Sequence, residues 1–144
     1  MAAHQSEQAL YDLVAGSMIG VLATIRRDGR PQLSNVVHAY DRDAGVIRVS
    51  ITDTRAKTRN LRRDPRASLH VSGNGGWSYA VAEGTAELTP VATAPDDAVV
   101  EELVELYRTL QGEHPDWADY RAAMVREQRL VLRLRVERVY GMAG

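Results

Sequence analysis

The sequence predicts a mainly β domain, in which six antiparallel strands form a small barrel with helices at its periphery. Three observations lead to this prediction. Short β-branched and apolar runs recur along the chain, short turns join most of them as hairpins, and the longer helical patterns come late. Closing six strands into a barrel also removes the exposed edges that an open sheet leaves. At this length we expect a single domain covering residues 1–144.

The first half of the chain carries four of the expected strands and two short helices. Residues 5–14 place apolar side chains at helical spacing and predict an amphipathic helix. Hairpin turns follow at Gly29, which can take a positive φ, and at residues 41–45. We expect a basic helix at residues 54–65. The four strands are expected at residues 18–25, 31–40, 46–51 and 67–72.

The second half begins with an unusual fifth strand, expected at residues 77–88. One of its faces carries large side chains. The other carries only small ones: Ser78, Ala80, Ala82, Gly84 and Ala86. Such a face allows another backbone or a flat ring to approach closely, and the alternative is simple packing within the chain. Helices are expected over residues 96–110, capped by Asp96, and over 115–127, and a final strand over 130–137.

Composition excludes several classes of function. The chain has no Cys, so disulfides, thiolate catalysis and Cys-zinc sites are ruled out. The four histidines lack metal-ligand spacing, and there is no P-loop, dinucleotide fingerprint or nucleophile elbow. We therefore assign no metal site and no catalytic side chain. No apolar run approaches ~18 residues and no export signal is visible, so we expect a cytoplasmic protein without a membrane partner.

Residues 54–66 are the most informative stretch, because they hold six of the eighteen Lys and Arg residues in a protein of net charge −1. A local positive patch predicts an anionic ligand, whereas nucleic acid requires a broad basic field. We expect Thr54 to cap a helix start that binds phosphate, and Lys57 to point toward the protein body like Leu61. The alternative is a solvated basic face. That alternative suits three arginines better: Arg59, Arg62 and Arg63.

Two further groups of residues have side chains suited to ligand binding. Gln32, Ser34 and Asn35 lie in one strand and Ser50 ends the next, where short polar groups can bond a heterocycle edge or a polyol. They can equally satisfy nearby backbone groups. Trp77 and Tyr79 follow a glycine-rich turn. They can stack on a flat ring, form a dimer interface or pack as half-buried surface.

Four stretches together resemble the split β-barrel flavin and deazaflavin oxidoreductases, the pyridoxamine 5′-phosphate oxidase-like superfamily. They are residues 19–25, 28–36, 55–61 and 76–84. The specific part is Arg55-Ala-Lys57-Thr-Arg-Asn60-Leu combined with Gly76-Trp-Ser-Tyr79. The resemblance covers essentially the whole chain. Within the superfamily, the chain is most similar to the actinobacterial branch that uses coenzyme F420.

This resemblance implies a split-barrel homodimer with cofactor at the subunit interface. It also implies that the small-residue face of the fifth strand is a subunit contact. In the family, residues matching Gln32, Ser34, Asn35 and Ser50 line the ring and the ribityl chain. Those matching Arg55, Lys57 and Asn60 bind the phosphate, and we count Ala56 with them. Those matching Trp77 and Tyr79 approach from the other subunit.

The departures from the family pattern favour one cofactor. The chain ends without the basic C-terminal motif of true pyridoxamine phosphate oxidases, and Pro31 and Gln32 fit the deazaflavin branch. F420 also has an anionic polyglutamate tail, for which Arg59, Arg62 and Arg63 are candidates. We therefore predict an F420-dependent oxidoreductase that passes a hydride to an unidentified electron-poor small molecule. The alternatives are an FMN-dependent oxidase or reductase and a non-catalytic deazaflavin carrier.

Overall fold

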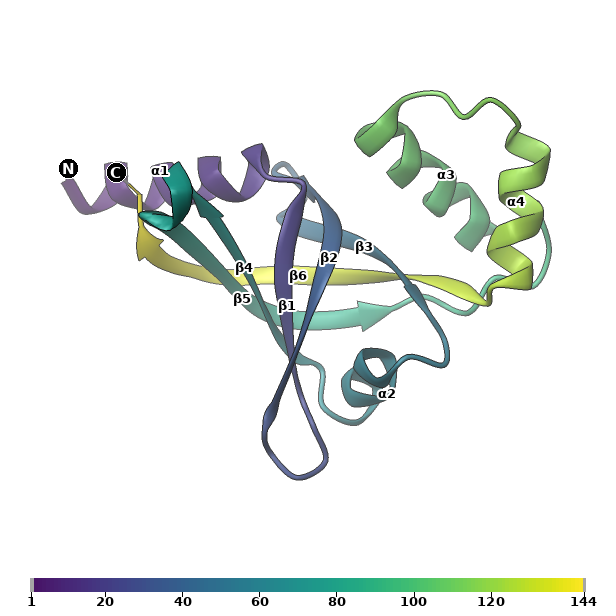
Figure 1. The fold of residues 1–144 in the computed structure, drawn as a ribbon, viewed down its shortest axis with the longest axis horizontal. Helices are drawn as coiled ribbons and strands as arrows, with labels where there is room; N and C mark the ends of the chain where they lie inside the picture. The colour runs from purple at the N-terminus through teal and green to yellow at the C-terminus, as the bar shows by residue number, and fades with distance from the viewer. Residues whose placement is uncertain (1, 144) are drawn as a thin grey trace.

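The structure is a computed structural model that describes residues 2–143, with side chains from residue 7 onward. Six antiparallel strands close into a barrel in the order β1-β2-β3-β6-β5-β4, so the predicted fold class is confirmed (Figure 1). Consecutive strands β1, β2 and β3 pair as hairpins, whereas β6 returns to lie between β3 and β5. The strands are β1 (Ile19–Ile25), β2 (Pro31–Asp41), β3 (Val46–Thr52), β4 (Arg66–Gly73), β5 (Ser78–Leu88) and β6 (Arg129–Met142).

The helices lie around the barrel. Figure 1 shows α1 beside the start of β5 and the end of β6, whereas α3 and α4 form a pair on the other side of the molecule. Helix α3 packs on β2, β3 and β6, and α2 packs on β1. Between residues 2 and 143, no helix combines the length and the apolar character needed to cross a membrane. The helices are α1 (Ala2–Gly16), α2 (Ala56–Arg63), the short 3₁₀ turn η1 (Asn74–Gly76), α3 (Ala98–Gln111) and α4 (Trp117–Arg126).

Three predicted boundaries were wrong. Strand β6 continues to Met142, because its pairing with β5 runs from Leu132 to Met142, whereas its pairing with β3 ends at Arg135. Helix α3 is capped by Asp97 and not Asp96, since the Asp97 carboxylate accepts the backbone N–H of Val100 at 2.9 Å. At α2 the cap position is Arg55 and not Thr54, and the Arg55 side chain makes no capping hydrogen bond.

The core corrects the interpretation of the small-residue face of β5. Ala80 and Ala82 are completely buried inside the barrel, where they join a core cluster with large side chains such as Leu22, Leu69 and Leu132. Small residues are needed there because the opposing strands already fill the interior with leucine and isoleucine. The expectation that this face is a subunit contact is therefore wrong, and it packs within the chain.

Gly84 illustrates how tightly β5 meets β6. A β-bulge interrupts the register between Glu83 and Gly84, and a Cβ at position 84 would lie 1.9 Å from the backbone oxygen of Arg135. Gly84→Ala is therefore expected to destabilise the fold by about 3 kcal/mol, measured by urea denaturation. Gly16→Ala is the control, since a Cβ there meets nothing within 4 Å and should change stability little. Equal stability of the two variants would contradict this packing.

Candidate functional site

A cavity of about 580 Å³ lies between the barrel and the α3–α4 pair, and we call it the main cavity. Its volume falls in the range of small-molecule sites, roughly 300–1,000 Å³. Strands β2 and β3, the start of β6 and the start of α2 supply its polar lining. Those polar and charged residues are Asn35, Ser50, Thr52, Arg55, Lys57 and Arg129, joined by Gln111 of α3.

Local contacts place the start of α2 at this cavity. The Thr58 hydroxyl is fully buried and donates to the Thr52 backbone oxygen at 2.7 Å, which fixes the first turn of the helix to the end of β3. Leu61, one turn later, is buried in the barrel core. With that face turned inward, Arg55 and Lys57 both reach the main cavity, as the position of Lys57 on the helix predicted.

The main cavity is electropositive. Among the described residues that line it there is no Asp or Glu, although Arg55, Lys57 and Arg129 all contribute cations. Burial lowers the pKa of the Lys57 ammonium group, and the neighbouring charges of Arg55 and Arg129 lower it further. Like charges held together in a half-buried site favour an anionic ligand, which would relieve their repulsion.

The opposite wall of the main cavity is apolar and aromatic. Tyr107 and Tyr120 of the α3–α4 pair have ring centroids 5.1 Å apart, and Trp117 packs edge-on against both. The Tyr120 hydroxyl donates to the Leu103 backbone oxygen at 3.1 Å, and burial raises the pKa of Tyr120 to about 12. The wall is therefore preformed and neutral. Its lining residues are Leu106, Tyr107, Leu110, Tyr120 and Met124.

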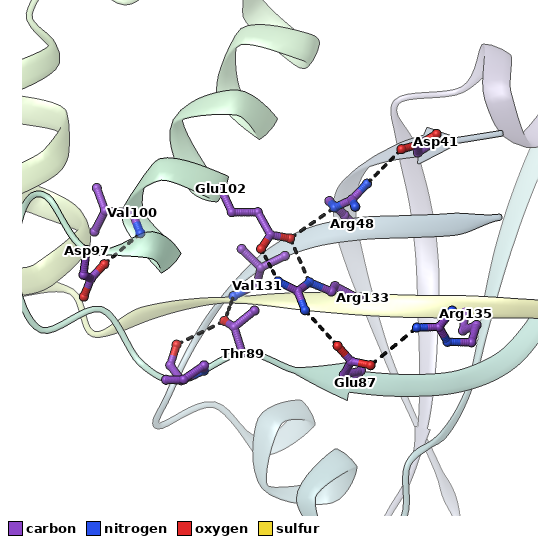
Figure 2. A network of polar contacts seen from close by, with 11 residues as sticks. Asp41, Arg48, Glu87, Thr89, Asp97, Val100, Glu102, Val131, Arg133 and Arg135 are labelled. Carbon is purple, nitrogen blue, oxygen red and sulfur yellow. Dashed lines mark hydrogen bonds and ion pairs between the residues drawn. The ribbon is translucent and has the colours of Figure 1, made fainter. Parts of the chain in front are cut away.

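An ion-pair network fastens α3 to the barrel (Figure 2). Glu102 of α3 accepts Nε–H groups from Arg48 of β3 at 3.1 Å and Arg133 of β6 at 2.9 Å. Arg133 also donates to Glu87 of β5 at 2.8 Å, which in turn pairs with Arg135. The hydrogen bonds from Arg133 lower the pKa of Glu102. The apolar wall of the main cavity thus depends on charges that bridge three strands and a helix.

Glu102→Gln is expected to lower the free energy of unfolding by about 2 kcal/mol at neutral pH, because two arginines lose their shared carboxylate. Glu105→Gln is the matched control, and it should cost at most about 0.5 kcal/mol, since this more exposed residue of α3 pairs with a single described side chain, Arg108. The folded-state pKa of Glu102 is depressed, so its contribution is present above about pH 4.3 and is lost as the pH falls. A difference between wild type and Glu102→Gln that does not shrink in acid would contradict this.

Asn60 and Gln32 are brought together, and their side chains hydrogen-bond to each other. The Asn60 amide donates to Gln32 Oε1 at 3.0 Å and to Thr24 Oγ1 at 3.2 Å, and its oxygen accepts from Arg63 at 2.9 Å. These bonds tie α2 to β1 and β2 and occupy both ends of the buried amide. Ala56 and Asn60 line a separate pocket of about 500 Å³, which we call the arginine pocket. Its other residues are Arg27, Arg59, Arg62 and Arg63.

The remaining predicted residues lie outside the main cavity. Ser34 is half-buried opposite Leu22 in the β1–β2 ladder. Trp77, which is 81% exposed, and Tyr79, stacked on His70 at 5.7 Å, lie at the start of β5. Figure 1 shows that start beside α1 and away from α2. Of the ten predicted site residues, a single chain brings four together at the main cavity: Asn35, Ser50, Arg55 and Lys57.

Sequence reasoning missed Arg129 and the helical wall. Arg129 reaches the cavity only because β6 pairs with β3, which sets it opposite Thr52. That pairing joins residues more than seventy positions apart, and no local pattern reveals it. In the sequence, the tyrosines of the wall resemble any other residues of an amphipathic helix. The spacing of Tyr107, Trp117 and Tyr120 around a short loop could nevertheless have indicated an aromatic cluster.

Comparison with known proteins agrees with this architecture. A model of the family described as pyridoxamine 5′-phosphate oxidase matches residues 6–143. The chain belongs to this family. Solved structures similar to this member of the pyridoxamine 5′-phosphate oxidase family include a conserved hypothetical protein from Mycobacterium tuberculosis, 26% identical, with a TM-score of 0.73. That match covers 96% of this chain and 84% of the other.

Two more relatives carry names that concern cofactors. A structure named F420 reductase is 25% identical with a TM-score of 0.61, and the match covers 90% of this chain and 94% of that one. An FAD-binding protein from Mesorhizobium loti is 20% identical with a TM-score of 0.67, covering 94% of this chain and 93% of that one. At this lower identity the similarity shows the common fold.

Proposed function

We propose that this protein is an F420-dependent reductase that passes a hydride from the reduced deazaflavin to an electron-poor small molecule. The observation that carries the proposal is the convergence of Arg55 and Lys57 on a cavity whose described lining has no carboxylate. Their side chains suit the negatively charged linker of such a cofactor. The similarity to a structure named F420 reductase over 90% of this chain supports the choice of cofactor.

The residues of the main cavity fit a ligand with a charged linker and a flat ring. Arg55 and Lys57 would hold the phosphate, while Asn35 and Ser50 offer hydrogen bonds along β2 and β3. The bound deazaflavin supplies the hydride chemistry. The protein's own contribution is to bind, to orient the acceptor against the ring and to exclude water behind the apolar wall of α3 and α4.

We further propose that the protein acts as a homodimer. The outward faces of β1 and β2 and the end of β6 expose large apolar side chains, which an interface with a second copy would remove from water. Pairing through this surface would let Trp77 and Tyr79 of one copy approach the cavity of the other. The exposed apolar residues are Met18, Ile19, Leu33, Val37, Trp77, Tyr140 and Met142.

FMN is the second candidate cofactor. The same arginine and lysine side chains suit a phosphate monoester, and the family takes its description from pyridoxamine 5′-phosphate oxidase. One titration distinguishes the two. Tryptophan fluorescence should be quenched at lower concentrations of F420 than of FMN, since Trp117 packs against the cavity tyrosines. Tighter binding of FMN than of F420 would favour an FMN-dependent enzyme. Binding of F420 without turnover of any tested acceptor would favour a deazaflavin carrier.

A further inference from the structure

Arg129 is positioned at the main cavity by a tight turn. Helix α4 ends at Arg126, and Gln128 then adopts φ 56°, a left-handed conformation that non-glycine residues rarely take. The Gln128 backbone oxygen accepts the N–H of Asp53 at 3.0 Å, which joins this turn to the end of β3. The turn therefore starts β6 with Arg129 opposite Thr52 and beside the first turn of α2.

The side chain of Arg129 uses only some of its N–H donors in contacts with the described side chains. Its Nε donates to Glu127 at 3.0 Å, and its Nη1 lies 3.4 Å from the Ser50 hydroxyl. Among the described side chains, no protein acceptor is found for its Nη2. Arg129 lines the main cavity, whereas Glu127 does not. The Glu127 carboxylate, which pairs with this guanidinium, thus lies outside the space where a ligand would bind.

We propose that Arg129 is a third anion-binding residue of the main cavity, acting with Arg55 and Lys57, and that Glu127 competes with the bound phosphate for its guanidinium. This inference rests on the proposed function, because the phosphate would belong to the cofactor. It assigns opposite effects to two neighbouring residues. Loss of Arg129 weakens phosphate binding, and neutralising Glu127 strengthens it, because the guanidinium is then free to turn to the ligand.

The test is calorimetric titration of wild type and four variants with F420, FMN and inorganic phosphate. Arg129→Gln should weaken binding of all three ligands about tenfold, the scale of one charge-assisted hydrogen bond. Arg129→Lys should recover part of that loss, because it keeps the charge without the planar fork. Glu127→Gln should strengthen binding about two- to fivefold. Arg126→Gln, an exposed arginine three residues away with the same change in charge, should stay within twofold of wild type.

Two outcomes would overturn the proposal. One is that Arg129→Gln binds phosphate with the same affinity as Arg126→Gln. The other is that Glu127→Gln and Arg129→Gln shift the affinity for phosphate in the same direction. A purely structural role for Arg129 would show as lost thermal stability without the opposite effect at position 127. If neither cofactor binds wild type but Arg129→Gln still weakens binding of inorganic phosphate, the proposed function fails and the role of Arg129 stands. Wild type that binds none of the three ligands overturns both.

Discussion

Lys57→Ala is expected to weaken F420 binding about 10- to 100-fold, which corresponds to roughly 1.5–3 kcal/mol for a lost charge-assisted hydrogen bond. Lys57 lies half-buried at the main cavity, where its ammonium group is disfavoured by burial and by the charges of Arg55 and Arg129. An anion placed there would compensate this unfavourable environment, so the gain on binding should exceed that of a surface pair. Equilibrium dialysis or fluorescence titration measures the effect.

Arg59→Ala is the matched control for this prediction. Arg59 lies on the same helix two residues later, is exposed, donates to the Thr54 backbone oxygen at 2.6 Å and lines the arginine pocket instead of the main cavity. Its loss should change the affinity for FMN, which has a phosphate but no polyglutamate tail, less than threefold, whereas Lys57→Ala should weaken FMN binding about tenfold or more. A larger effect of Arg59 than of Lys57 would move the anion site to the arginine pocket. Unchanged affinity in Lys57→Ala would reject the assignment outright.

Leu33→Glu is expected to convert the protein from a dimer to a folded monomer. Leu33 is 64% exposed on the outward face of β2, in the apolar surface proposed as the dimer interface. A carboxylate there would be buried at two symmetry-related positions without a partner, at a cost of about 2–4 kcal/mol in association free energy. Analytical ultracentrifugation measures the change in association, and calorimetric titration should show that cofactor affinity falls with it.

Ala118→Glu controls for the added charge. Ala118 is exposed on α4 and lies outside the apolar surface, so this variant should remain a dimer. Thermal stability separates a lost interface from a lost fold, since an exposed Leu33 contributes little to the monomer. A dimer that survives Leu33→Glu would contradict the proposed interface, and with it the proposal that Trp77 and Tyr79 act on the partner's cavity.

The barrel was predictable because its signals are local. Gly29 and Gly45 adopt the positive φ angles that their turns require, and the alternation in β2 buries Val36 and His38 while exposing Leu33 and Val37. The interior face of β5 was misinterpreted because small residues fit either a subunit contact or a crowded core. Only the completed barrel shows that large side chains from other strands occupy the space left by Ala80 and Ala82.

The site was less predictable, because tertiary pairing decides where polar side chains go. The positions of Arg55 and Lys57 at a helix start were sufficient to predict that both side chains reach the protein body at one place, the main cavity, where we propose an anion site. Asn60, from the same motif, is bonded instead to Thr24 and Gln32, and only the packing of α2 on β1 and β2 shows this. Arg129 was not predicted, because no sequence motif marks it as a site residue. Its helix-to-strand turn carries no ligand signal until β3 and β6 pair.

A crystal structure of the protein soaked with F420 tests the central claim most directly. We expect the phosphate within hydrogen-bonding distance of the Lys57 ammonium and the Arg55 guanidinium, with the ring extending along β2 and β3 between two copies of the chain. The contradicting result is F420 bound at the arginine pocket, or at a site formed by one copy alone, with the Lys57 side chain free of the phosphate.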